Sequence, residues 1–125
     1  MRICVPTLDT EGLHSQLSEH FGRAPYLTLI DSERQAPEFV RNPGAHHAAG
    51  SCQTAELLRG RTVDVLVCRG LGQKAFRRLE EMGIQVFAVE SPDVASALAE
   101  YRSGAARALT SERACHGEGD HHSCG

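Results

Sequence analysis

Residues 63–90, VDVLVCRGLGQKAFRRLEEMGIQVFAVE, decide the fold class of this chain. The stretch begins with a continuous β-branched run at 63–68, which is typical of a buried strand. Apolar residues then recur at helical spacing from Leu71 to Met82, and Gly83 ends the helix. A second apolar run closes the stretch. This order of strand, helix and strand predicts a β-α-β unit.

Three further strands are expected from short β-rich runs before this unit. They are RICVPT, YLTLID and PEFVRN, at residues 2–7, 26–31 and 37–42. The last two are close enough along the chain to form a hairpin. Pro37 suits a strand at the edge of a sheet, because it has no N–H to donate.

Two further helices are expected, at residues 51–60 and 91–104. The second has Ser91 as its cap, Pro92 at its first helical position and Gly104 as its terminator. A hairpin followed by alternating strands and helices implies a mixed sheet with helices on both faces. The fold class is therefore α/β.

Length and composition limit the function classes. The 125 residues suffice for one domain, and the net charge of −3 leaves no basic face for nucleic acid. The sequence has neither an apolar stretch of the ~20 residues that span a membrane nor a signal peptide. We therefore expect a cytoplasmic protein, in which the five cysteines are thiols or ligands. Periodicity ends near Leu109, which predicts a domain at 1–109 and a flexible tail at 110–125.

The tail ends with ACHGEGDHHSCG and gathers soft metal ligands. They are Cys115, His116, His121, His122 and Cys124. Thiolate and imidazole groups select zinc, copper(I) and the iron of clusters, so we expect metal binding here. The spacing matches no standard zinc finger, and the plainer alternative is a solubilising end with incidental histidines and cysteines.

A second candidate site lies in HFGRAP, between the first two strands. His20 offers one metal ligand, and Arg23 offers a fixed cation for an anionic cluster or oxyanion. The alternative is that His20 caps a helical turn and Arg23 pairs with a carboxylate.

The loop GAHHAAGSC adds His46 and His47, for which a binding role is favoured. Cys52 near the start of a helix could have a lowered pKa, but a place on the buried helix face is the favoured interpretation. Cys4 is expected in the core, and Cys68 either in the core or at the following turn.

The turn CRGLGQKA lies between a strand and a helix. Gly70, Gly72 and Ala75 match the pattern G-x-G-x-x-A, and Glu90 follows at the distance of a dinucleotide fingerprint. Free amides at the start of the helix could bind a phosphate, a molybdate-like anion or a cluster sulfide. The plainer alternative is that the glycines only permit a tight turn.

SEHFGRAPYLTLID at Ser18–Asp31 resembles the signature of the dinitrogenase iron–molybdenum cofactor biosynthesis family. The resemblance continues through residues 63–87 and covers about 1–104. That family includes NifX- and NafY-type cofactor carriers and the C-terminal domain of NifB. Membership implies a ribonuclease H-like, three-layer α/β/α fold with a five-stranded mixed sheet. It also implies non-enzymatic binding of iron–sulfur or molybdenum-containing clusters.

The resulting hypothesis is a carrier or accessory protein for a metallocluster, not an enzyme, with metallocluster donor or acceptor proteins as partners. One mouth of the sheet would hold the cluster, using His20, Arg23, His46, His47, Gly70 and Gly72. The alternatives are a mononuclear zinc module that uses the tail alone and a nucleotide-phosphate binding domain. A nuclease of the same fold needs converging acids, and Asp64 is the only acid in the expected buried strand.

Overall fold

The computed structural model describes residues 1–31, 37–42 and 54–109, and these form a mixed α/β fold around one sheet. The strands are β1 (Arg2–Thr7), β2 (Tyr26–Asp31), β3 (Glu38–Arg41), β4 (Val65–Cys68), β5 (Gln85–Ala88) and β6 (Arg107–Ala108). Their order in the sheet is β3-β2-β1-β4-β5-β6. The β1–β4 and β4–β5 pairs are parallel, and the other three pairs are antiparallel. The expected mixed sheet and the β2–β3 hairpin, with β3 at an edge, are therefore confirmed.

The expected number of five strands is wrong, because the sheet has six. The additional strand, β6, pairs with β5 through only two residues, and both are exposed. A strand of two residues is too short for an alternation of apolar and polar residues, so no sequence pattern predicts it. Its position is fixed by Leu109, whose N–H donates to the carbonyl of Val86 at 2.9 Å. The ribonuclease H-like topology implied by the resemblance stays a prediction.

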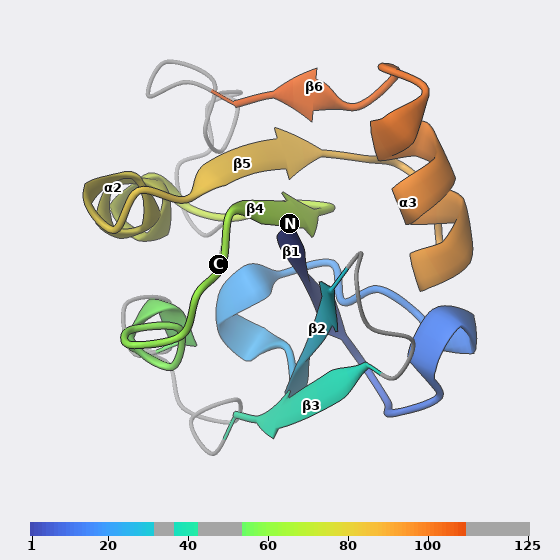
Figure 1. Cartoon of the computed structure of the whole chain (residues 1–125), viewed down its shortest axis with the longest axis horizontal. Coiled ribbons are helices and arrows are strands. Elements are labelled where there is room, and N and C mark those ends of the chain that lie inside the picture. The colour runs from blue at the N-terminus through green and yellow to red at the C-terminus, as the bar shows by residue number, and fades with distance from the viewer. Residues whose placement is uncertain (32–36, 43–53, 110–125) are drawn as a thin grey trace.

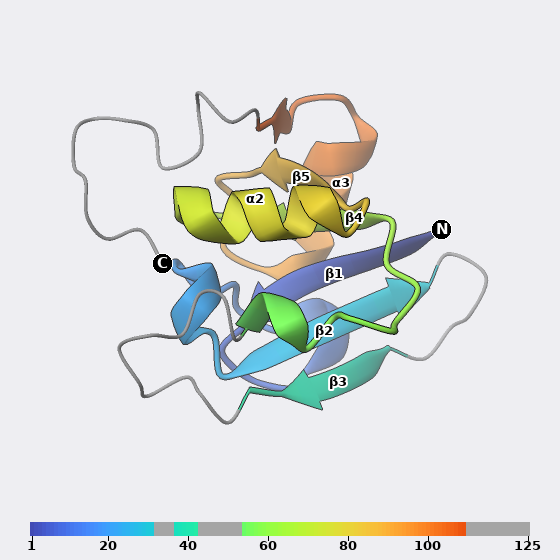
Figure 2. The same cartoon turned by 90° about the vertical axis from the view of Figure 1, so that its left-hand side faces the viewer.

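Helices lie on both faces of the sheet, as Figure 1 shows for α2 (Gln73–Glu81) and α3 (Val94–Arg102). Two single 3-10 turns, η1 (Gly12–His14) and η2 (Phe21–Arg23), occupy the long connection between β1 and β2. A short helical turn at 54–56 continues into turns up to Gly60. Figure 2 shows α2 in front of β4 and β5, with this green helical turn in front of β1 and β2.

The alternation of side chains along β4 divides the interior into two cores. Leu66 and Cys68 point to the face covered by α2 and join the first core with Leu79. Val65 and Val67 point to the other face and join the second core beneath α3. Every residue of β4 is therefore buried, which explains its continuous apolar sequence.

The start of α3 differs from the expectation. Ser91 is not its cap and Pro92 is not its first residue; the N-cap is Asp93, whose carboxylate accepts a hydrogen bond from the N–H of Ser96 at 2.7 Å. The Ser91 hydroxyl instead donates to the carboxylate of Glu100 at 2.6 Å. Ser91, Pro92 and Asp93 are all suited to the start of a helix. Asp93 is the N-cap because its side chain accepts a hydrogen bond from a main-chain N–H of the first turn.

The helix expected at 51–60 is helical in its described part only at 54–56. The bonds that follow it link residues three apart, as from the N–H of Leu58 to the carbonyl of Ala55 at 3.0 Å. No helix in the described residues is both long enough and apolar enough to cross a membrane.

Candidate functional site

The candidate site lies at the carboxyl ends of the parallel strands β1 and β4. After β1 the chain passes to the second core, where Leu17 is buried, whereas after β4 it passes to α2 on the first core. Neighbouring strands whose connections leave toward opposite faces define the place where open α/β sheets bind ligands. We call this place the mouth and define it by the segments 18–24 and 69–72.

Gly70 joins the two segments of the mouth. The N–H of Phe21 donates to the carbonyl of Gly70 at 3.1 Å. A Cβ atom on Gly70 would lie 3.2 Å from the carbonyl oxygen of Glu19, closer than ordinary contact. Gly70 is therefore needed for close approach of two main chains. Gly72 is the N-cap of α2 with φ of −79°, which any residue can adopt.

Phe21 fixes this arrangement to the core. Its ring is fully buried in the first core, and burial of such a side chain stabilises by roughly 1.5–3 kcal/mol. Ser18 holds His20, the residue before Phe21. The Ser18 hydroxyl accepts a hydrogen bond from the N–H of His20 at 3.3 Å and donates one to the His20 carbonyl at 3.0 Å. The main chain of this turn is therefore fixed on both sides of the His20 side chain.

His20 and Arg23 are both exposed. His20 is the N-cap of η2 by backbone position, but its side chain makes no capping hydrogen bond. Within the described residues, neither side chain is in a hydrogen bond or an ion pair. Among the described residues, nothing fills the structural roles considered as alternatives for these two side chains.

The charge of the mouth favours an anion. The N-cap of α2, Gly72, has no side chain, and the first turn of α2 contains no acid to offset the positive end of the helix dipole. Arg69 and Lys74 are exposed on either side of this N-cap. Within segments 18–24 and 69–72, Arg23 and Arg69 give two cationic side chains and Glu19 gives one carboxylate, and Lys74 adds a cation in the first turn of α2.

A third loop completes the rim of the mouth. The N–H of Leu17 donates to the carbonyl of Pro92 at 2.8 Å, and the N–H of Val94 donates to the carbonyl of Ser15 at 3.0 Å. The N–H of Ser18 donates to the carbonyl of Pro6 at 3.0 Å. The loops that follow β1, β4 and β5 are thus connected by main-chain hydrogen bonds, which gives the mouth a fixed frame.

The two described cysteines are closed off from solvent in this conformation. Cys4 and Cys68 are both buried in the first core, which places Cys68 in the core and not at the turn. Burial raises the pKa of the Cys68 thiol to about 12, and burial likewise raises the pKa of the Cys4 thiol. Both are therefore protonated thiols at neutral pH.

Several predicted ligands lie outside the described residues. They are His46, His47 and Cys52 in the 43–53 segment and Cys115, His116, His121, His122 and Cys124 in the tail. Their roles stay predictions. Among the described residues no group of three or more histidine, cysteine or acidic side chains could hold a metal ion.

Sequence reasoning missed two buried polar residues near the mouth, Asn42 and Thr54. They flank the 43–53 segment, and both hydrogen-bond to main-chain carbonyls of the Gly22–Pro25 stretch. No local pattern marks them, because these contacts link residues that are distant in sequence.

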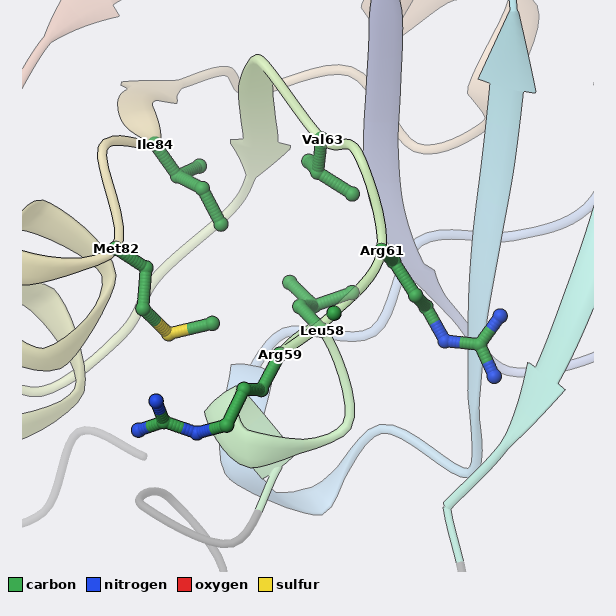
Figure 3. A pocket seen from close by; sticks show the side chains of 7 residues that line it. Leu58, Arg59, Arg61, Val63, Met82 and Ile84 are labelled. Carbon is green, nitrogen blue, oxygen red and sulfur yellow. The ribbon is translucent and has the colours of Figure 1, made fainter.

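A pocket of about 230 Å³ lies at the opposite end of the sheet, before β4 and β5. Figure 3 shows Leu58, Val63, Met82 and Ile84 around its centre, whereas the guanidinium of Arg61 points away. The remaining lining residues are Arg59 and Gly60. The guanidinium groups of both arginines are already in ion pairs, with Glu56 and Glu38 respectively. We therefore place the candidate site at the mouth.

These features define a class of protein: a small mixed α/β domain with an open, cationic mouth at the carboxyl end of its sheet. The family model described as dinitrogenase iron-molybdenum cofactor matches residues 1–104. The chain therefore belongs to this family, which confirms the resemblance seen in the sequence. Membership places it with proteins of iron–molybdenum cofactor biosynthesis or carriage. A comparison with curated proteins finds no significant match.

Solved structures with the same fold include two that share more than a quarter of the sequence. The apo form of the orange protein from Desulfovibrio gigas is 27% identical, with a TM-score of 0.78 over 86% of this chain and 92% of that one. A proposed NifB protein from Thermotoga is 28% identical, with a TM-score of 0.74 over 86% and 92%. A proposed dinitrogenase from Methanocaldococcus jannaschii is 12% identical, with a TM-score of 0.64 over 88% and 95%, and supports the fold alone.

Proposed function

We propose that this protein is a cytoplasmic, non-enzymatic carrier or accessory protein that binds an anionic iron–sulfur or molybdenum-containing cluster at the mouth. The observation that carries the proposal is the pair of exposed side chains, His20 and Arg23, which have no partner within the described residues. They lie on a turn that is fixed to Gly70 by a main-chain hydrogen bond. The proposal includes a ribonuclease H-like topology.

The chemistry of the mouth suits a cargo that must be released. Clusters built from iron or molybdenum with sulfide are commonly anions, so the cations Arg23, Arg69 and Lys74 would attract them at long range. Arg23 stays charged at any physiological pH and presents several donors. His20 offers one imidazole ligand. One ligand and several charges give a weaker hold than a closed set of thiolates, which is the property a carrier needs.

The comparisons support this proposal through the names of the related structures. One is an apo form, and the other is described as a proposed NifB protein. The family match ends at residue 104, before the cysteine- and histidine-rich tail. It therefore does not favour the alternative in which the tail alone forms a mononuclear zinc module. Delivery to or from a partner protein follows from a carrier role.

Nucleotide binding and catalysis receive less support. The strand that follows β5, β6, is antiparallel and two residues long, whereas a dinucleotide fold continues with parallel strands. A nuclease would need several acids converging on metal ions, and no such group occurs among the described residues.

The test is anaerobic reconstitution of the full chain with ferrous iron, sulfide and molybdate, followed by visible absorption, metal analysis and acid-labile sulfide. We expect a coloured complex, and roughly 10-fold weaker cluster retention in Arg23→Ala, which corresponds to about 1.4 kcal/mol. Arg102→Ala, at an exposed arginine at the end of α3, is the matched control. Failure of the wild-type chain to take up any cluster, or equal retention in both variants, would overturn the proposal.

A further inference from the structure

We propose that Asn42 and Thr54 are positioning residues of the mouth, an inference that rests on the proposed function. Both are buried, with exposed fractions of 5% and 0%. Neither belongs to the HFGR motif, and neither would touch the ligand. They act on Arg23 through the main chain on either side of it.

Hydrogen bonds link the side chains of Asn42 and Thr54 to each other and to the main chain of the turn. The side-chain amide of Asn42 donates to the carbonyl of Ala24 at 2.8 Å and to the hydroxyl of Thr54 at 3.0 Å. The Thr54 hydroxyl in turn donates to the carbonyl of Gly22 at 3.2 Å. The Gly22 carbonyl belongs to the peptide group directly before Arg23, and the Ala24 carbonyl belongs to the Ala24–Pro25 peptide, one peptide group beyond the bond that follows Arg23. The main chain is therefore held both before and after Arg23. The direction in which the Arg23 side chain leaves the surface is thereby set.

The turn needs this support because its own hydrogen bonds are few. η2 is a single 3-10 turn, closed by the N–H of Arg23 to the carbonyl of His20 at 3.2 Å and that of Ala24 to Phe21 at 3.3 Å. Such turns have poorer hydrogen-bond geometry than α-helices. Among the described residues, Asn42 and Thr54 are the hydrogen-bond partners of the carbonyls of the buried residues Ala24 and Gly22, and a buried carbonyl without a partner is costly.

The same two residues lie on either side of the 43–53 segment in the sequence. Asn42 precedes it and also donates its main-chain N–H to the carbonyl of Pro25 at 2.9 Å. Thr54 follows it directly. The two residues that flank this segment in the sequence are therefore both hydrogen-bonded to the main chain around Arg23.

Thr54→Val tests the proposal, because valine keeps the shape and removes the hydroxyl. Thr28→Val is the matched control: Thr28 is also fully buried, and its hydroxyl lies 2.9 Å from that of Thr7, a partner outside segment 18–24. Thr54→Ser restores the hydroxyl. Thr54→Cys has a similar volume and a weak S–H donor, so its effect should lie between those of Thr54→Ser and Thr54→Val. This variant replaces Thr54→Val in the comparison if the valine variant folds poorly.

Two measurements are made on the full chain. The first is native-state hydrogen exchange at the amides of Arg23 and Ala24, which we expect to rise at least about 10-fold in Thr54→Val beyond the change in Thr28→Val. The second is the Kd for tetrathiomolybdate, an anionic molybdenum–sulfur probe. We expect it to weaken roughly 5- to 10-fold in Thr54→Val, because a smaller fraction of molecules holds the binding conformation. Thr54→Ser should recover both values.

The outcomes separate this inference from the proposed function. Unchanged exchange at Arg23 and Ala24, or a Thr54→Ser variant that behaves like Thr54→Val, overturns the positioning role. A Kd that changes equally in Thr54→Val and Thr28→Val overturns it as well, since that result would reflect global stability alone. If the wild-type chain does not bind the probe, binding of this anion fails, and the exchange comparison alone decides the positioning role.

Discussion

The N–H of Phe21 donates to the carbonyl of Gly70 across 3.1 Å, and this one bond joins the two family motifs of the chain. Phe21 lies in the HFGR turn, and Gly70 lies in the turn that leads from β4 to α2. Both motifs therefore act as one structural unit at the mouth, although they are distant in sequence. Their joint binding role is the proposal to be tested.

Gly70→Ala should loosen this junction. The added Cβ would lie 3.2 Å from the carbonyl oxygen of Glu19, a main-chain atom that cannot rotate away. We expect a loss of unfolding free energy of about 1–3 kcal/mol, measured by urea denaturation, and faster exchange of the Phe21 amide. Unchanged stability together with an unchanged Phe21 amide would show that the two segments are not held together by close approach.

The buried thiols predict a loss of stability at alkaline pH. Burial raises the pKa of Cys68 to about 12 and raises that of Cys4, from an ordinary value of 9.0. Above pH 9 the unfolded chain releases these protons and the native chain keeps them, so stability is full below pH 9 and falls toward pH 12. Each thiol contributes a slope of up to about 1.4 kcal/mol per pH unit.

The measurement is urea denaturation from pH 8 to 11 on the wild type and on the Cys4→Ala/Cys68→Ala variant. The variant is less stable at pH 8 because two buried side chains are shortened, so the slopes are compared rather than the absolute values. A slope in the variant as steep as in the wild type would mean that other groups cause the alkaline loss. In addition, a thiol reagent should leave both cysteines unmodified in the native state.

Asp93 predicts a loss at the acidic end. Hydrogen bonds from Ser96 lower the pKa of the Asp93 carboxyl below its ordinary value of 3.8. Its contribution is therefore present above pH 4 and is lost as the pH falls through the lowered pKa. Asp93→Ala should lower the Tm by a few degrees at pH 7, and Asp93→Asn should restore most of it, because asparagine also caps helices. Equal Tm values for Asp93→Ala and the wild type would contradict the cap.

A pair of truncations separates the domain from its tail. A chain that ends at Leu109 should melt within a few degrees of the full chain, because the sequence of residues 110–125 has no apolar face. A chain that ends at Gly104 loses β6 together with Leu109, which packs against the first core. We expect it to be less stable by about 2–3 kcal/mol. Scanning calorimetry checks both, and equal stability of the two would show that β6 is dispensable.

The strands and helices of the interior could be predicted from the sequence because they bury periodic apolar residues. The run before Cys68 and the spacing from Leu71 to Met82 are examples. Elements that depend on other contacts could not be predicted. β6 forms from two exposed residues beside β5, and the start of α3 is set by which of three neighbouring residues reaches a free N–H.

The residues of the mouth likewise fall into those that the sequence predicts and those that it does not. His20, Arg23 and Gly70 belong to local motifs and could be singled out from the sequence, although their binding role stays a prediction. Asn42 and Thr54 could not, because each is an ordinary polar residue until the fold brings it against Gly22 and Ala24. Buried polar contacts of this kind have no period and no spacing.

The frame of the mouth also determines how this site can diversify. The bonds that join its three loops run from Phe21 to Gly70, Leu17 to Pro92 and Val94 to Ser15, and all of them are main-chain to main-chain. Most side chains can be exchanged without breaking a main-chain bond. Exposed positions such as His20, Arg23 and Arg69 can therefore mutate while the scaffold keeps its geometry. Under the proposed carrier function, such a scaffold can acquire new cargoes over evolutionary time through point mutations at its rim.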